Sequence, residues 1–400
     1  MTPTHVREER RALVLATIAF FTCFYAWSLL GPLAPGLQQQ LHLTEVQVGW
    51  MVAIPVVMGS LMRIPMGALT DRFGARRVLP ALMVSSALPL LALAIWHQAF
   101  WQLIVFGFLL GFAGSSFAVG VPFVSRWYSG GGQGAALGIY GMGMGGTVLA
   151  ALTTPTIAEQ LGTGAPFALS AVLVVAVGLV FGWAAREAPR TGRVTANLLG
   201  SFGVFRSDVR AWALTLFYFL AFGGFVAMFL YLPKLLVSVY GLGKTDAAAR
   251  AAGFALLAVL ARPLGGWLAD RIGATRVLLV AFAGSAILAA VLTGFYKQIV
   301  PLTAACLSLA VAFGLGTGAV FKMVGEEFPG HVGSVTGVVG AAGGLGGFFP
   351  PIVMATVKAT TGSFTLGFLL LSATAVICLA VLTLMRTPPV LTPPARAVQG

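Results

Sequence analysis

The chain contains Arg63-Ile-Pro-Met-Gly67-Ala-Leu-Thr-Asp71-Arg72-Phe-Gly74-Ala-Arg-Arg77, and 199 residues later Arg262-Pro-Leu-Gly-Gly266-Trp-Leu-Ala-Asp270-Arg271-Ile-Gly273-Ala-Thr-Arg276. The two copies indicate an internal duplication. Each copy begins with an arginine inside an apolar stretch long enough to cross a bilayer. A cation in hydrocarbon costs at least ~2.5–3.5 kcal/mol, so it usually faces a cavity and acts there. The duplicated arginines therefore predict a symmetric anion site within a membrane.

The composition is that of an integral membrane protein. Of the 400 residues, 58% are hydrophobic and 9% are charged, and the mean hydropathy is +0.94. A soluble fold does not bury this much apolar surface. Apolar runs of about 20 residues recur along the chain, and they are continuous rather than alternating, which favours helices over a β-barrel. We therefore predict an all-α integral membrane protein.

The apolar runs predict twelve transmembrane helices in two pseudo-symmetric halves. Residues 186–209 are polar and basic, and they are expected to form a cytoplasmic linker between six-helix halves at 1–185 and 210–386. The Pro-rich tail 387–400 is expected to be disordered and cytoplasmic. The predicted spans cover residues 12–36, 46–70, 77–96, 100–126, 134–157, 165–185, 210–233, 247–270, 275–295, 299–322, 333–357 and 364–385.

The net charge of +13 is unevenly distributed. Lys and Arg cluster before the first predicted span and after the second, fourth, sixth, eighth and twelfth, whereas 37–45, 97–99 and 158–164 contain none. This positive-inside pattern places both termini in the cytoplasm. We expect a multi-pass protein of the cytoplasmic (inner) membrane that touches anionic membrane lipids and binds no nucleic acid.

The sequence shows no pattern typical of catalysis or metal binding. Cys23, Cys306 and Cys378 fall in apolar spans without CxxC or Cys/His ligand spacing, so no disulfide framework, metal site or cofactor is expected. No nucleophile–base constellation appears, which argues against an enzyme. An anion sensor without transport is a further alternative, but no appended soluble domain is expected that could relay a signal.

Neither repeated arginine has an expected acidic partner. Each lies eight residues before Asp71 or Asp270, which places it ~12 Å into the membrane from a helix end. The eleven acidic residues lie in loops or near span ends: Glu8, Glu9, Glu45, Asp71, Glu159, Glu187, Asp208, Asp246, Asp270, Glu326 and Glu327. A planar oxyanion is the expected partner, because guanidinium presents a planar fork. The alternative is a structural arginine that donates to helix carbonyls.

The distribution of titratable groups also bears on coupling. The histidines, His5, His42, His97 and His331, lie in loops or at span ends. Proton-driven transporters usually carry an embedded acid or histidine as the proton carrier. The sequence therefore favours anion exchange, or a proton that travels with the substrate or through water. A tyrosine or a bound anion could also mediate coupling.

Glycines recur in the fifth and eleventh spans at the same 199-residue offset. Gly134, Gly138, Gly141 and Gly145 match Gly333, Gly337, Gly340 and Gly344. Small residues at these spacings let helix backbones approach closely. We expect tight packing that permits rocking and leaves room for a small substrate beside the arginines.

Two sets of motifs carry a resemblance to a known family. The duplicated six-helix plan, with Gly67 to Arg77 and its copy Gly266 to Arg276, resembles the major facilitator superfamily and its signature loop. The segment Gly316-Thr-Gly-Ala-Val-Phe321-Lys322, followed by Gly333-Ser-Val-Thr-Gly337 through Gly343, is similar to the second signature of the nitrate/nitrite porter family. Residues 117–145 partly match the first signature. The resemblance covers essentially the whole chain.

The resemblance implies alternating-access transport of nitrate and/or nitrite, with a proton or counter-anion as a possible partner, by a monomer. It implies that Arg63 and Arg262 bind the anion, that Tyr218 adds a hydrogen bond, and that Phe117 and Phe321 sandwich the ion. Gly143, Gly343 and Met144 complete the expected substrate-binding set. Conformational gating is expected from Gly67, Asp71, Arg72, Gly266, Asp270 and Arg271.

One residue departs from the family pattern. The family usually has an asparagine in the fifth-span glycine run, where this chain has Met144. Methionine has no donor for a nitrate oxygen. The alternative function is therefore transport of another small or organic anion by the same fold.

Overall fold

The structure, a computed structural model, describes residues 3–128, 131–188 and 203–385. Twelve helical segments in this part of the chain are long and apolar enough to cross a membrane, which confirms the predicted fold. Residues 189–202 of the predicted linker and residues 386–400, which include the predicted tail, lie outside the described residues. The twelve segments are Val6–Leu41, Val46–Phe73, Ala75–Ile95, Phe100–Trp127, Gln133–Leu161, Ala165–Ala184, Val209–Tyr240, Asp246–Ile272, Ala274–Phe295, Ile299–Glu327, Val332–Phe349 and Thr365–Leu384.

The N-terminal half supplies six of these segments. Its helices are α1 (Pro3–Trp27), α2 (Leu30–Leu41), α3 (Glu45–Phe73), α4 (Ala75–Ile95), α5 (Phe100–Leu110), α6 (Ser116–Trp127), α7 (Gln133–Gly141), α8 (Gly145–Leu161) and α9 (Ala165–Ala184). The first span is built from α1 and α2 together. The fourth combines α5 with α6, and the fifth combines α7 with α8.

The C-terminal half supplies the other six segments. Its helices are α10 (Gly203–Ser207), α11 (Val209–Tyr218), α12 (Gly224–Tyr240), α13 (Lys244–Ile272), α14 (Ala274–Phe295), α15 (Ile299–Glu327), α16 (Val332–Thr361) and α17 (Thr365–Leu384). The seventh span joins α11 to α12, whereas α10 is a short helix that precedes it.

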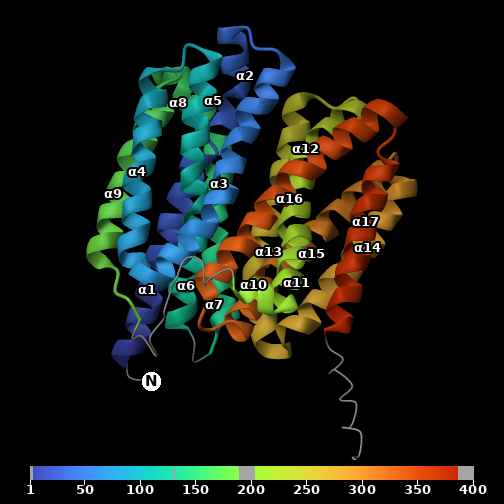
Figure 1. Cartoon of the computed structure of the whole chain (residues 1–400). Coiled ribbons are helices and arrows are strands. Elements are labelled where there is room, and N and C mark those ends of the chain that lie inside the picture. The colour runs from blue at the N-terminus through green and yellow to red at the C-terminus, as the bar shows by residue number, and fades with distance from the viewer. Residues whose placement is uncertain (1–2, 129–130, 189–202, 386–400) are drawn as a thin grey trace, which may run out of the picture.

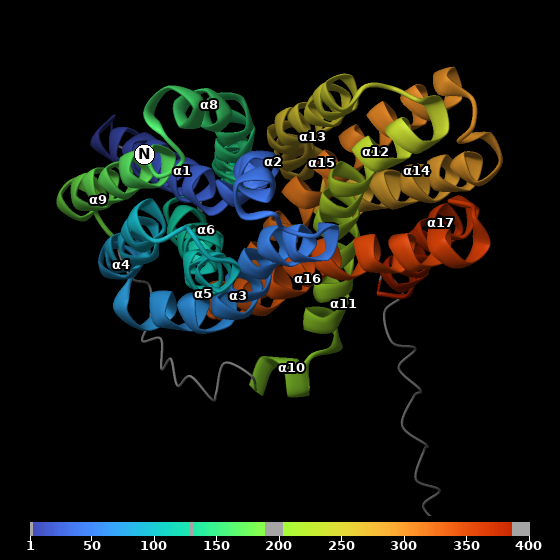
Figure 2. The ribbon, with the colours of Figure 1, turned by 90° about the horizontal axis from the view of Figure 1, so that it is seen from above.

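The two halves form two bundles that lie side by side (Figure 2). Their ribbons diverge away from the end at which α1 begins (Figure 1). That end carries Arg72, Arg126, Arg186 and Arg210, and we call it the basic end. The contacts between the halves described below join them at this end and at mid-height.

Glycines bring the halves into backbone contact. Helix α3 packs against α16, and α7 packs against α13. A Cβ added to Gly67 would meet the carbonyl oxygen of Gly333, and one added to Gly266 would meet that of Gly134. These two pairs are equivalent in the sequence repeat. The halves therefore touch along two related lines, and the predicted tight packing of the glycine runs is confirmed.

Three spans contain irregular turns within the membrane. Gly111–Ser115 (η1) and Met142–Met144 (η2) are 3₁₀ turns, and Phe219–Gly223 (η4) is a π-helical turn. Such turns interrupt the regular i→i−4 hydrogen bonds of an α-helix and leave carbonyls for other donors. Irregular backbone at this depth is tolerated where protein covers it, as at a buried site.

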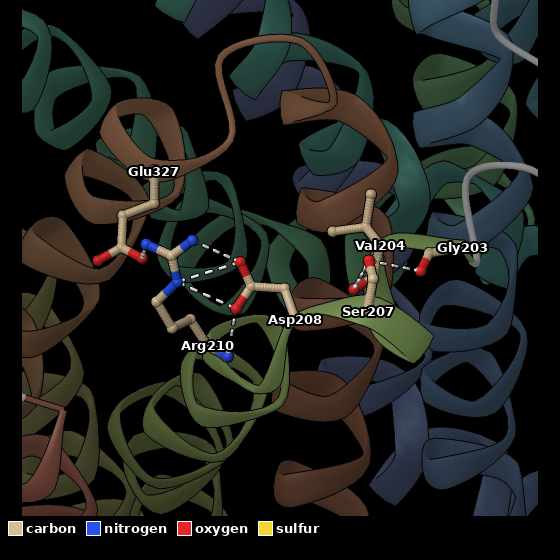
Figure 3. Close-up of polar contacts among 6 residues, drawn as sticks. All are labelled: Gly203, Val204, Ser207, Asp208, Arg210 and Glu327. Carbon is tan, nitrogen blue, oxygen red and sulfur yellow. Dashed lines mark hydrogen bonds and ion pairs between the residues drawn. The ribbon is translucent and has the colours of Figure 1, made fainter. Parts of the chain in front are cut away.

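The described end of the linker is fastened to the C-terminal half. The Asp208 carboxylate caps α11 by accepting from the Arg210 backbone N–H at 2.9 Å. The Arg210 guanidinium lies 2.6 Å from Asp208 Oδ2 and 3.4 Å from Glu327 Oε2 at the end of α15 (Figure 3). Its hydrogen bonds hold the pKa of Asp208 below the ordinary value. Trp212 Nε1 donates to the Phe205 carbonyl at 2.7 Å, which holds α10 against α11.

The beginning of the linker is fastened to the N-terminal half. Arg186 Nη1 lies 3.1 Å from Glu8 Oε1, and the Arg186 carbonyl accepts from Trp127 Nε1 at 3.1 Å. Glu187 accepts from the Arg76 backbone N–H at 2.7 Å and so caps the start of α4. Each half therefore holds its own end of the connection.

Candidate anion site between the two halves

Arg63 on α3 and Arg262 on α13 are both buried, with 3% and 4% of their surface exposed. Arg63 Nη1 donates to the Gly340 carbonyl on α16, and Arg262 Nη1 donates to the Gly141 carbonyl on α7 at 3.2 Å. Gly141 and Gly340 are separated by the same offset as the arginines. Each arginine therefore reaches across the interface to the other half, and the two contacts are related by the repeat.

Among the described residues, no carboxylate balances the positive charge of this pair. Neither guanidinium group forms an ion pair with a described acidic residue, and Tyr218 is the titratable neighbour that both share. Arg63 Nε has a second carbonyl partner, Gly114 at 3.4 Å. Arg262 Nη2 is buried and has no hydrogen-bond partner among the described residues. A buried charge normally has a counter-charge, so this arrangement suits an anion.

The three aromatic residues expected beside the arginines do lie together. The Phe321 ring meets the Phe117 ring at 4.8 Å and the Tyr218 ring at 4.6 Å between centroids, both edge to face. The Phe117 and Tyr218 rings are parallel, with centroids 6.2 Å apart. Because Phe117 and Phe321 touch each other directly, the expected sandwich requires these two rings to part when an ion enters.

Tyr218 also adjoins the arginines. Its hydroxyl lies beside the Arg262 guanidinium, and both arginines act on it electrostatically. The Arg63 Cζ atom lies 5.9 Å from the Phe117 centroid. Two arginines, one tyrosine and one phenylalanine from four different spans thus converge.

Sequence reasoning missed three aromatic residues of the same cluster. The Phe222 ring in η4 has both guanidinium carbons at 5.5 Å from its centroid, and it stacks on Tyr218 at 5.2 Å. Phe20 and Tyr140 stack at 4.9 Å and both adjoin Phe117. The available signal for Phe222 was its position four residues after Tyr218, on the same helix face.

The glycines assigned to substrate binding support aromatic rings. A Cβ on Gly143 would meet the Phe20 ring, and one on Gly343 would meet the Tyr218 ring. Met144 is buried at the end of η2. Its repeat mate is Gly343, so the two halves differ at this position. The two glycines thus leave the space that the Phe20 and Tyr218 rings occupy.

Two aspartates join the halves at the basic end. Asp71 at the end of α3 accepts from the backbone N–H groups of Gly333 and Ser334 at 3.2 and 2.9 Å, at the start of α16. Asp270 at the end of α13 accepts from Gly134 and Ala135, both at 2.8 Å, at the start of α7. A carboxylate is favoured at a helix N-terminus by the free N–H groups and the helix dipole.

Each aspartate also has a cationic partner within its own half. Arg126 Nη2 lies 2.7 Å from Asp71 Oδ1, and Lys322 Nζ lies 3.2 Å from Asp270 Oδ1. Lys322 also pairs with Glu326 at 3.1 Å, so it serves in an ion-pair network at the interface.

The structure brings only part of the expected gating set together. Gly67, Gly266, Asp71 and Asp270 meet the opposite half, as described above. Arg72 and Arg271 are exposed and lie over Phe73 and Trp267, at 5.0 and 4.3 Å from the ring centroids. In this state these two arginines lie outside the contacts between the halves.

The chemistry available here is binding of a small anion. Two guanidinium groups, a tyrosine hydroxyl and aromatic faces surround the same place. Among the described residues, no three His, Cys, Asp or Glu side chains are grouped to hold a metal ion. The cysteines of this part of the chain are buried thiols.

Comparison with known proteins agrees with this chemistry. The profile described as Major Facilitator Superfamily matches residues 16–351 and 244–399. The chain is 41% identical over 389 residues to the probable nitrate/nitrite transporter NarK2 of Mycobacterium tuberculosis strain H37Rv, covering 96% of this chain and 98% of that protein. It is 36% identical over 370 residues to the nitrite extrusion protein of Bacillus subtilis strain 168, covering 92% and 93%.

A solved structure shares the fold. The proton:xylose symporter XylE superposes with a TM-score of 0.81 at 14% identity, covering 96% of this chain and 97% of that one. At this identity the likeness concerns the fold alone. The superfamily and the relatives are those of transporters rather than enzymes.

Proposed function

This chain belongs to the nitrate/nitrite porter family of the Major Facilitator Superfamily, and on that premise we propose that it moves nitrate or nitrite across the cytoplasmic membrane by alternating access. The observation that carries the proposal is the pair of buried arginines, one from each half, without an acidic partner in the part of the chain that the structure describes. A planar oxyanion can present an edge of two oxygen atoms to a planar guanidinium fork.

Binding would exchange one set of contacts for another. In the described state each arginine donates to a glycine carbonyl of the opposite half. An anion is a stronger acceptor than a neutral carbonyl, because charge-assisted hydrogen bonds are about twice as strong. An ion held by Arg63 and Arg262 together would bridge the halves and release the Gly340 and Gly141 carbonyls. The Tyr218 hydroxyl would add a further donor beside Arg262.

The basic end would face the cytoplasm, since loops rich in Lys and Arg remain on that side. Asp71 and Asp270 would then hold the cytoplasmic end closed in this state, with Gly67 and Gly266 allowing the backbones to touch. Opening that end requires both carboxylates to leave their helix N-termini. We propose no latch role for Arg72 and Arg271 in this state, because both lie on the surface.

We propose exchange as the mode of transport. Arg63 and Arg262 place two like charges in a low-dielectric interior, and a bound anion offsets them. Passage between the two states is therefore expected to be easier with an anion bound than without one. Uptake coupled to protons is the second candidate, and a different small anion is the alternative favoured by Met144.

Purified protein in liposomes tests the function. We expect nitrate influx when nitrite or nitrate is trapped inside, and little influx when the lumen contains neither ion. Protein-free liposomes give the background, and chloride and small carboxylates added outside test selectivity. If neither nitrate nor nitrite moves under any of these conditions, but labelled chloride or a labelled small carboxylate does, the alternative substrate replaces this proposal.

A further inference from the structure

We infer that Phe222 is an internal competitor of the transported anion: its ring attracts both arginines, and a binding anion must draw them away from it. The inference rests on the proposed function and adds a positioning residue to it. The starting observation is that both guanidinium carbons lie 5.5 Å from the centroid of this one ring.

The distances fit cation–π attraction. A guanidinium within about 6 Å of an aromatic centroid is attracted to the negative face of the ring, and the attraction grows when water is removed. Phe222 is buried, and so are both arginines. The ring therefore supplies partial negative charge to Arg63 and Arg262 at once, in a place where no described carboxylate does so.

Phe222 is held in place by a neighbouring ring that covers one of its two faces. It stacks on Tyr218 at 5.2 Å with ring planes 5° apart. The π-helical turn Phe219–Gly223 carries it, and that turn packs on α16 through Gly223 and Gly346, where a Cβ on Gly223 would meet the Gly346 backbone. The position equivalent to Phe222 in the first half is Cys23, so the repeat does not explain an aromatic residue here. Only the C-terminal half has an aromatic residue at this position of the repeat, yet its ring contacts both Arg63 of the N-terminal half and Arg262 of the C-terminal half.

A bound anion would turn the two forks toward its oxygen atoms, and the guanidinium groups would give up part of their attraction to the ring. The hydrogen bonds to the anion then raise the affinity of the wild-type protein for nitrate, and the cation–π attraction that binding must overcome lowers it. An aliphatic side chain in place of the ring removes that opposing attraction. Phe222→Leu is therefore expected to bind nitrate more tightly, whereas a ring that merely lines the anion site predicts weaker binding.

The test is isothermal titration of nitrate into the purified full-length protein. We expect the Kd of Phe222→Leu to fall by about fivefold or more, the size of one cation–π interaction. Phe222→Met provides a second non-aromatic side chain if the leucine variant does not fold. The matched control is Phe254→Leu, because Phe254 is also buried and also stacks on another ring, that of Phe225 at 6.0 Å, instead of on Phe222 or the arginines. Its Kd is expected to stay within about twofold of wild type, well short of the change expected when a cation–π interaction is removed.

The outcomes separate this inference from the proposed function. Wild-type protein that binds neither nitrate nor nitrite overturns the proposed function and this inference with it. Wild-type protein that binds nitrate, with unchanged or weaker binding in both Phe222 variants, overturns only the inference. Equal tightening in Phe254→Leu also overturns it, because the effect would then belong to aromatic packing in general.

Discussion

At the scale of single residues, Gly343 sets the position of the tyrosine beside the arginines. A Cβ at this position would meet the Tyr218 ring. Gly343→Ala must therefore displace the ring, and overpacking of this kind costs ~1–3 kcal/mol. We expect a higher KM for nitrate influx in liposomes and a lower unfolding temperature. Gly145→Ala is the control, because its Cβ would lie 3.5 Å from Phe21, an ordinary contact. An unchanged KM in Gly343→Ala would mean that Tyr218 does not touch the substrate.

The residues found from the sequence pattern itself are those whose chemistry conflicts with their surroundings, whereas Phe117, Phe321 and Tyr218 came from the family resemblance alone. Arg63 and Arg262 are charges in apolar spans, so they were identified without coordinates. Phe222 was not, because a phenylalanine among 29 in a membrane protein is ordinary. Its importance depends on two arginines that are distant in sequence meeting at one ring. Gly143 and Gly343 were placed in the substrate set, but a glycine in a sequence does not reveal which side chain occupies the space beside it.

At the scale of helices, the two aspartates govern the basic end. Asp71 and Asp270 each cap a helix of the other half. The double substitution Asp71→Asn and Asp270→Asn removes both negative charges. Each charge stabilises the helix N-terminus that it caps by about 1 kcal/mol. We expect the closed form of this end to become less populated. The measurement is double electron–electron resonance between spin labels attached at Arg72→Cys and Arg271→Cys, which are both exposed positions. The distance between the two labels should be longer in the aspartate variant than with native aspartates.

The labelled pair with native aspartates is the control for that experiment. Distances that match the control would show that glycine packing alone closes this end. The aspartates were predicted from the repeated motif, and so were their neighbours Arg72 and Arg271. A step of about 100° per residue turns each of these arginines away from the interface that its aspartate faces. The motif alone does not show this difference in direction.

At the scale of the whole molecule, the placement of acids separates exchange from proton coupling. Asp71 and Asp270 accept hydrogen bonds from helix N-termini at the basic end, and no described carboxylate adjoins Arg63 or Arg262. We therefore expect nitrate/nitrite exchange in liposomes to be insensitive to a pH gradient between about pH 6 and 8, where an embedded acid or histidine would titrate. A lumenal pH indicator should stay constant during exchange. Nitrate accumulation driven by the gradient into an anion-free lumen would instead establish proton symport.

The architecture was predictable from the sequence because hydropathy and the 199-residue repeat both report on it directly. Twelve spans follow from apolar run length, and the paired halves follow from the duplicated motif. The irregular turns were not predicted. Hydropathy does not distinguish the π-helical turn at Phe219–Gly223 from a regular α-helix, and that turn bears the ring that meets both arginines.

The most direct measurement of the central claim is nitrate affinity in Arg63→Lys and Arg262→Lys, with Arg72→Lys as the surface control. Lysine keeps the charge but loses the planar fork. We expect each of the first two substitutions to raise the Kd by about tenfold or more, which corresponds to ~1.4 kcal/mol, and the control to match wild type. Wild-type affinity in both Arg63→Lys and Arg262→Lys would contradict an anion clamp built from these two arginines.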